Sequence, residues 1–183
     1  MHSHNKSVVH MEHERKYLIR MPSKSFFSDN VVLTSSIEQT YLSKPYSMYE
    51  ERVRAEYAHP AEHPIYTLTT KTTWSSTSRK EENRTLSYSE YMFFYTSDTR
   101  EETLLKIRHL FPTRRHLFEI DIYPFWERYA ILEVELSFPE QKVHLPNCLH
   151  VIAEVTADKR FSNRRLAIKH ITEEELDNEY RNL

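Results

Sequence analysis

Charged residues recur at every second position through most of this chain. Glu12, Glu14 and Lys16 are each separated by one residue, a spacing that directs side chains to one face of a β-strand. The same spacing returns further along the chain in pairs and single charges: Arg52 and Arg54, Lys71, Arg79 and Glu81, Lys106 and Arg108, Glu119 and Asp121, Glu133 and Glu135, and Glu154. A half-buried strand usually turns scattered charges to water. Here the charges form one basic and one acidic set, which predicts a sheet face that lines a polar cavity.

The basic set suits a polyanion. Arginine matches phosphate oxygens with two parallel hydrogen bonds, and lysine acts as a compact point charge. The basic positions exceed what a monophosphate needs and favour a linear chain of phosphoryl groups; they are Arg52, Arg54, Lys71, Arg79, Lys106 and Arg108.

The acidic set suits a divalent cation. Carboxylates that face one cavity repel each other by several kcal/mol unless some are protonated or cations lie between them. Carboxylate oxygens without His or Cys partners favour Mg²⁺ or Mn²⁺ over zinc. Exposed strand faces whose acids pair with lysines across the sheet are the alternative, but two Glu-x-Glu patterns and Glu154 favour a metal site.

Together the basic and acidic sets predict phosphoryl transfer. Water is the expected nucleophile, because Cys148 lacks a strand-facing His partner.

The composition excludes several other classes of protein. A net charge of −2 argues against nucleic-acid binding driven by overall charge. No apolar run approaches the roughly 20 residues that a membrane helix needs, and residues 1–10 lack the apolar core of a signal peptide. The single cysteine cannot form an internal disulfide, which predicts a cytoplasmic protein. With no glycine in the chain, a glycine-rich phosphate loop is excluded.

The elements that must position these charges are mainly strands. Segments rich in Thr, Tyr, Val or Ile and bounded by Pro, Ser or Asn predict strands at 11–20, 33–43, 47–57, 64–73, 79–87, 103–111, 115–123, 129–138 and about 150–156. Helices are predicted from Pro22 to about Phe27, from Ser87 to Thr96 and from Asn163 to Asn182. We expect residues 1–10 to form a loose tail and 11–183 a single domain. The fold class is mainly β, an antiparallel barrel of about eight strands with a charged interior and helices packed outside.

The order of the motifs resembles one known family. Glu12-x-Glu14-x-Lys16 is similar to the ExExK signature of the CYTH superfamily, the triphosphate tunnel metalloenzymes. The family's later motifs have counterparts in the same order: Arg52-Val-Arg54, Thr69-Thr-Lys71, Arg79-Lys-Glu81, Lys106-Ile-Arg108, Glu119-Ile-Asp121, Glu133-Val-Glu135 and the stretch from Glu154 to Asn163. One five-residue pattern is weak on its own, but the ordered series extends over nearly the whole chain.

This resemblance implies an eight-stranded antiparallel tunnel that binds a triphosphate end-on and hydrolyses it with Mg²⁺ or Mn²⁺. It implies that the triphosphate is bound by Lys16, Arg52, Arg54, Lys71, Arg79, Lys106, Arg108 and Lys159. It implies catalytic roles for Glu12, Glu14, Lys16, Glu133 and Glu135. Metal ligands would come from Glu12, Glu14, Glu133, Glu135 and Glu154, while Glu81, Glu119 and Asp121 would orient the basic residues or hold a second metal. The expected partner is a small triphosphate, and the expected state is a monomer or homodimer.

The chain also departs from the family. Asn83 stands where many members carry a third acid, and Thr72 and the stretch 124–127 replace glycines. Thiamine triphosphatase and adenylate cyclase activities stay open, because related tunnels perform both. Trp74 or Trp126 could stack on a thiamine or adenine ring, although packing is the simpler role for both. A non-catalytic polyphosphate- or nucleotide-binding module is a further alternative, against which the acidic set argues.

Overall fold

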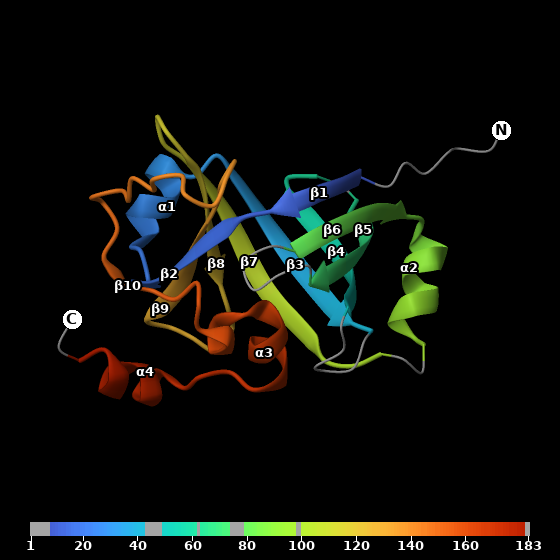
Figure 1. Ribbon diagram of the computed structural model, residues 1–183. Helices are drawn as coiled ribbons and strands as arrows, with labels where there is room; N and C mark the ends of the chain where they lie inside the picture. The colour runs from blue at the N-terminus through green and yellow to red at the C-terminus, as the bar shows by residue number, and fades with distance from the viewer. Residues whose placement is uncertain (1–7, 43–48, 62, 74–78, 98–99, 182–183) are drawn as a thin grey trace.

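The computed structural model describes residues 8–42, 49–61, 63–73, 79–97 and 100–181, without the side chains of residues 8–12, 73 and 79. Ten strands of these residues form one antiparallel sheet in the order β1-β6-β5-β4-β3-β7-β8-β9-β2-β10 (Figure 1). The strands are β1 (Val8–Glu12), β2 (Glu14–Arg20), β3 (Leu33–Tyr41), β4 (Tyr49–His59), β5 (Ile65–Thr73), β6 (Arg79–Leu86), β7 (Thr103–Pro112), β8 (Leu117–Ile122), β9 (Tyr129–Glu135) and β10 (Val151–Glu154). The helices are α1 (Lys24–Asn30), α2 (Tyr88–Tyr95), η1 (Lys159–Phe161), α3 (Asn163–Ile168) and α4 (Glu173–Glu179).

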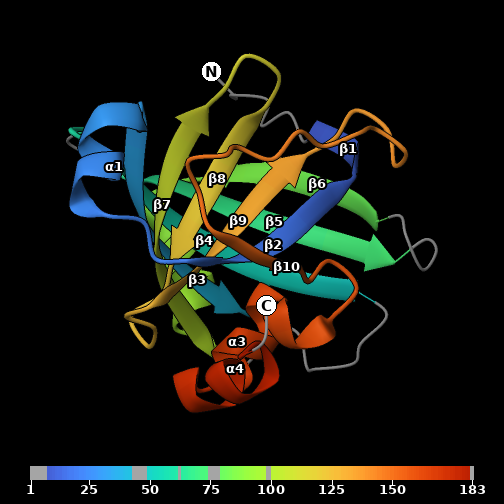
Figure 2. The same ribbon diagram turned by 90° about the vertical axis from the view of Figure 1, so that its left-hand side faces the viewer.

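The strand predicted at 11–20 is divided at His13. β1 pairs with β6, whereas β2 pairs with β9 and β10, so consecutive strands lie near opposite ends of the sheet order. The sheet curls strongly (Figure 2), and the chain changes partners at His13 as it passes from one side to the other. The closed barrel of about eight strands is therefore not confirmed: the described strands number ten, and their hydrogen-bonded order ends at β1 and β10.

The expected tail is also corrected in part. Residues 1–7 lie outside the described part of the chain, whereas Val8–His10 belong to β1 and pair with Glu81–Asn83 of β6. Backbone hydrogen bonds to a neighbouring strand order these three residues, a feature that the sequence pattern did not signal.

Apolar side chains cover the face of the sheet opposite the charges. Phe26 of α1 packs there with Tyr17, Phe111 and Phe118, and α2 packs against β4, β5 and β6 through the buried Tyr91. Helix α1 begins two residues later than predicted because the Ser23 hydroxyl accepts a hydrogen bond from the Phe26 amide and caps the helix. These two helices lie outside the curled sheet, as the sequence predicted.

The C-terminal helices lie elsewhere. The predicted helix at 163–182 is two helices, because Thr172 and Glu175 form a capping box that starts α4 anew. Leu166 and Leu176 pack with Leu18, Leu104 and Ile131. Leu18, Leu104 and Ile131 are each two residues from Lys16, Lys106 and Glu133, so alternation puts them on the face that carries the charges. The helices α3 and α4 thus add an apolar layer beside the charged groups rather than covering the opposite face. No helix in the described ranges is long and apolar enough to cross a bilayer.

Candidate functional site

The strand register brings the charged residues to one face of the sheet. Lys16 lies opposite Glu133, Glu133 opposite Glu119, and Asp121 opposite Arg108. Residues directly opposite in an antiparallel pair point to the same side, and residues two apart on one strand do so as well. The same face, hereafter the charged face, continues through the opposed pairs Gln39 and Arg54, Tyr41 and Arg52, Lys71 and Glu50, Glu81 and Lys71, and Glu12 and Arg79.

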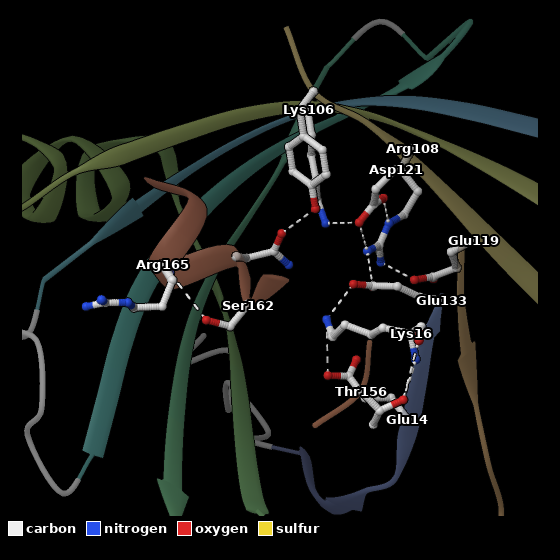
Figure 3. A network of polar contacts seen from close by, with 12 residues as sticks. Glu14, Lys16, Lys106, Arg108, Glu119, Asp121, Glu133, Thr156, Ser162 and Arg165 are labelled. Atoms are coloured by element: carbon white, nitrogen blue, oxygen red, sulfur yellow. Dashed lines mark hydrogen bonds and ion pairs between the residues drawn. The ribbon is translucent and has the colours of Figure 1, made fainter. Parts of the chain in front are cut away.

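Arg108 is the centre of the ionic network on this face (Figure 3). Its guanidinium donates to Asp121 from Nε and Nη2, both at 2.7 Å, and to Glu133 from Nη2 at 2.8 Å. Nη1 forms a further ion pair with Glu119. Burial disfavours the charged guanidinium, but Asp121, Glu133 and Glu119 outweigh burial and hold the pKa of Arg108 well above its ordinary value. Arg108 is therefore a permanent cation whose charge is balanced by three carboxylates.

Lys16 extends this network to β2. Its Nζ lies 2.5 Å from Glu133 Oε1 and 3.2 Å from Glu14. Burial opposes protonation of Lys16, yet Glu133 and Glu14 raise its pKa above the ordinary value. Burial likewise opposes ionisation of Glu133, but Lys16 and Arg108 hold its pKa well below the usual range. Glu133 is thus an ionised carboxylate that accepts from Lys16 with one oxygen and from Arg108 with the other.

Lys106 and Asp121 form the most deeply buried ion pair of the network. Their side chains are fully covered, and Nζ lies 2.5 Å from Asp121 Oδ2. Burial, together with the neighbouring charges of Arg108 and Arg54, lowers the pKa of Lys106 to about 8. A second anion placed near Lys106 would stabilise its protonated form.

A separate ionic group lies on β5 and β6. Lys71 contacts Glu81 at 2.7 Å, and Asn83 donates to the other oxygen of Glu81 at 2.8 Å. Thr69 in turn donates to the Asn83 carbonyl at 2.7 Å. Burial raises the pKa of Glu81, but Lys71 and Arg52 outweigh it and lower that pKa to about 2. Asn83, the predicted departure from the family pattern, is thus a neutral bridge between β5 and an ionised carboxylate.

Arg52 and Arg54 have uncharged neighbours on β3. Arg54 Nη2 donates to the Gln39 side-chain oxygen at 3.2 Å, and the Gln39 amide donates to the Tyr41 hydroxyl at 2.6 Å. Burial and the nearby charges of Arg52 and Arg108 lower the pKa of Arg54 to about 10. Sequence reasoning missed Gln39 and Tyr41. Their two-residue spacing could have indicated them, but neither side chain carries a charge.

Other predicted site residues lie apart from this network. Glu154 is exposed, accepts a hydrogen bond from Thr156 at 2.9 Å and lies 3.9 Å from Arg15. It lies opposite Tyr17, one position from Lys16, after an irregularity in β10, so alternation directs it away from the charged face. Lys159 begins η1 and is exposed. The strands place Glu12 and Arg79 opposite each other, but their side chains are outside the described part of the structure.

The donor chemistry of β2 and β9 fits a divalent cation. Glu14 lies opposite Glu135, which is exposed at the end of β9, and Glu133 is two residues away on the same face. Carboxylate oxygens are the ligands that Mg²⁺ and Mn²⁺ prefer. Within the described ranges, no three His, Cys, Asp or Glu side chains already converge closely enough to hold a metal, and Glu133 contacts Lys16 and Arg108.

Solved structures share this fold, although no protein-family model and no curated protein matches the chain. The inorganic triphosphatase NE1496 has a TM-score of 0.56 and 23% sequence identity, over 88% of this chain and 96% of the other. A second structure of NE1496, described as a hypothetical protein, has a TM-score of 0.55 and 22% identity, over 87% and 99%. A conserved hypothetical protein from Pyrococcus furiosus has a TM-score of 0.48 and 17% identity, over 69% and 82%. The likeness to NE1496 shows that this chain shares the fold of that protein.

Proposed function

We propose that this chain, which has the fold of the triphosphate tunnel (CYTH) proteins, is a divalent-metal-dependent triphosphatase with inorganic triphosphate as its preferred substrate. The observation that carries the proposal is the gathering of Arg52, Arg54 and Arg108 on one sheet face by the strand register, where burial and the charges of Arg52 and Arg108 lower the pKa of Arg54. Like charges that lie close together in a buried site repel each other and destabilise the fold. A bound polyanion would offset this repulsion.

The basic residues would bind and orient the substrate. Arg52 and Arg54 present guanidinium groups from β4, while Lys71 and Lys106 add point charges from β5 and β7. These groups are fixed before the substrate arrives, so they can stabilise charge that develops on the phosphoryl oxygens without reorganisation. The apolar layer from α3 and α4 packs on Leu18 and Leu104, next to Lys16 and Lys106, and its low polarity would strengthen the electrostatic contacts of these two lysines.

The acidic residues would hold the metal and accept a proton. Glu14, Glu133 and Glu135, with Glu12 from the neighbouring strand, are the ligands we propose for Mg²⁺ or Mn²⁺. When bound, the cation supplies positive charge to the phosphoryl oxygens and makes an attacking water more acidic. A carboxylate of the charged face would accept the proton of that water. Glu119 is the one that we propose: it lies opposite Glu133, and burial raises its pKa above the ordinary value.

Two other enzymatic activities use the same kind of site. Adenylate cyclisation and thiamine triphosphate hydrolysis each need a pocket for a ring. Trp126 does not supply one, because its indole is buried and donates to the Ile171 carbonyl at 2.7 Å, and Trp74 lies outside the described residues. Inorganic triphosphate needs no stacking partner, and we therefore rank it first.

A non-catalytic anion-binding module is the alternative from another class. Such a module gains nothing from Glu119, Asp121 and Glu133 around Arg108, since each carboxylate repels the anion. We therefore favour turnover over binding alone.

The test is phosphate release from inorganic triphosphate, ATP and thiamine triphosphate, each with Mg²⁺, Mn²⁺ or EDTA. The proposal predicts metal-dependent release that is fastest from inorganic triphosphate. Cyclic AMP formed from ATP would indicate a cyclase, and triphosphate binding without release in either metal would indicate the binding module.

A further inference from the structure

Two uncharged side chains occupy the middle of the charged face. Gln39 and Tyr41 are both fully buried, and they lie on β3 directly opposite Arg54 and Arg52, respectively. Every other β-strand that borders this part of the face contributes charges, so a buried amide and a phenol here call for a physical reason.

The hydrogen bonds fix the orientation of the Gln39 amide. Arg54 can only donate, so the side-chain oxygen of Gln39 must face it, at 3.2 Å from Nη2. The amide nitrogen then faces the hydroxyl of Tyr41, to which it donates at 2.6 Å. The opposite orientation would place two donors against each other and leave a buried polar group without a partner.

Tyr41 is itself held in place from two directions. The Arg164 guanidinium of α3 lies 4.6 Å from the centroid of its ring, within the range of a cation–π contact. Burial raises the pKa of the phenol, while Arg52 opposes this through its charge and a hydrogen bond to Tyr41. A continuous series of contacts therefore runs from α3 through Tyr41 and Gln39 to Arg54, with Arg52 attached at Tyr41.

The neutrality of Gln39 distinguishes Arg54 from Arg108. The charge of Arg108 is balanced by Asp121, Glu133 and Glu119. Arg54 instead meets an amide oxygen, and Glu56 lies farther away at 3.7 Å. An amide orients a guanidinium without neutralising it, so the charge of Arg54 stays available for an anion.

We propose that Gln39, hydrogen-bonded to Tyr41, is a positioning residue that holds Arg54 in a triphosphate-binding orientation without itself neutralising the charge of the guanidinium. This inference rests on the proposed function, because it concerns the same anion site. Gln39 does not touch the substrate; it acts through Arg54.

The experiment measures the dissociation constant for inorganic triphosphate by calorimetry in EDTA, so that no turnover intervenes. Wild type is compared with Gln39→Leu, Gln39→Glu, Arg54→Ala and the double variant Gln39→Leu/Arg54→Ala. We expect Gln39→Leu to weaken binding about tenfold, the scale of one lost hydrogen bond to a charged group, and Gln39→Glu to weaken it further because its carboxylate neutralises Arg54. In the Arg54→Ala background the Gln39→Leu change should have no further effect.

The matched control is Thr40→Val. Thr40 lies between Gln39 and Tyr41, is equally buried and has a hydroxyl contact with Thr103 at 2.9 Å on the opposite face. It should change thermal stability without changing triphosphate affinity. Tyr41→Phe removes the hydroxyl partner of Gln39 at nearly constant volume and should weaken binding as well. Because the hydroxyl also contacts Arg52, Tyr41→Phe is measured in the Arg54→Ala background too. A loss that appears with Arg54 present and disappears in Arg54→Ala keeps the test decisive if Gln39→Leu folds poorly.

The outcomes separate the two proposals. If wild type binds no triphosphate, the proposed function fails and this inference with it. If wild type binds but Gln39→Leu and Tyr41→Phe bind equally well, or if the losses at Gln39 and Arg54 simply add, the anion site stands and the positioning role is wrong.

Discussion

Glu133 joins Arg108 to Lys16 through its two carboxylate oxygens. Oε2 accepts from Arg108 Nη2 at 2.8 Å and Oε1 accepts from Lys16 Nζ at 2.5 Å, so one side chain of β9 holds a cation of β7 and a cation of β2. Both oxygens are also the atoms that a divalent cation would use. If Glu133 served as a metal ligand, its bonds to Lys16 and Arg108 would be weakened, and the charges of these two residues would be more available to the triphosphate.

Removal of the Glu133 charge should abolish most turnover. Glu133→Gln keeps the shape of the side chain but loses the proposed metal ligand and the ionic partner of Lys16. We expect phosphate release to fall at least about 100-fold, the scale reported for loss of one charge-stabilising group in an active site. Circular dichroism should show an intact sheet, and Glu140→Gln, in an exposed turn, should act as wild type. Unchanged hydrolysis in Glu133→Gln would contradict the site assignment.

The fully covered pair of Lys106 and Asp121 should matter for stability. Replacement of Lys106 by Met leaves Asp121 with only Arg108 as a charged partner among the contacts described here. Breaking a buried pair costs about 3–5 kcal/mol, and we expect the lower end because Arg108 still neutralises part of the charge. Denaturant unfolding of Lys106→Met should show this loss. A change in unfolding free energy below about 1 kcal/mol would mean that the desolvation cost of burying the two charges cancels their mutual attraction.

Acid should destabilise the fold partly through Glu81. Its pKa is about 2 in the folded protein, against 4.5 ordinarily, chiefly because Lys71 and Arg52 outweigh burial. A carboxyl whose folded pKa is depressed contributes stability that is complete above its ordinary pKa and is lost as the pH falls toward the folded value. Wild type should therefore exceed Glu81→Gln in unfolding free energy at pH 6, and the difference should shrink between pH 4.5 and pH 2. A difference that stays constant over this range would contradict the ionic role of Glu81.

Metal removal should stop hydrolysis without unfolding the sheet. The carboxylates of the network already have Lys and Arg partners within the described structure, so the site does not need a cation to remain folded. EDTA should abolish phosphate release and leave the melting temperature nearly unchanged, and added Mg²⁺ or Mn²⁺ should restore release. A fall of many degrees in EDTA would show instead that the cation is part of the fold.

The alternating pattern predicted the strands well because it is a local property of the chain. Most strand boundaries fall within a few residues of those observed, and the register then aligns Lys16, Glu133, Asp121 and Arg108 on one face. The pattern cannot reveal a change of pairing partner. Glu12, Glu14 and Lys16 keep the same two-residue spacing on both sides of His13. The backbone nevertheless pairs with β6 before this residue and with β9 after it.

Glu154 shows a second limit of sequence patterns. Its place in a Glu-Val-Thr stretch suggested a side chain on the charged face, but a shift of register in β10 puts it opposite Tyr17. One residue of slip exchanges the two faces of a strand. No local preference in the sequence marks such a slip.

Gln39 shows a third limit. A glutamine on a strand is unremarkable in a sequence, and its importance depends on which residue lies opposite in the folded sheet. That residue is Arg54, fifteen positions later. Only the pairing of β3 with β4 gives the amide its role.

The division of the N-terminal strand at His13 also bears on how the chain folds. The contact between Lys16 and Glu133 joins residues 117 positions apart, while the hairpins from β3 to β6 form between near neighbours. Long-range pairing of this kind raises contact order and slows folding, because the entropy of a long loop is lost before its contacts form. The ionic network that joins β2, β7 and β9 should therefore be among the last parts to assemble, after the local hairpins have formed.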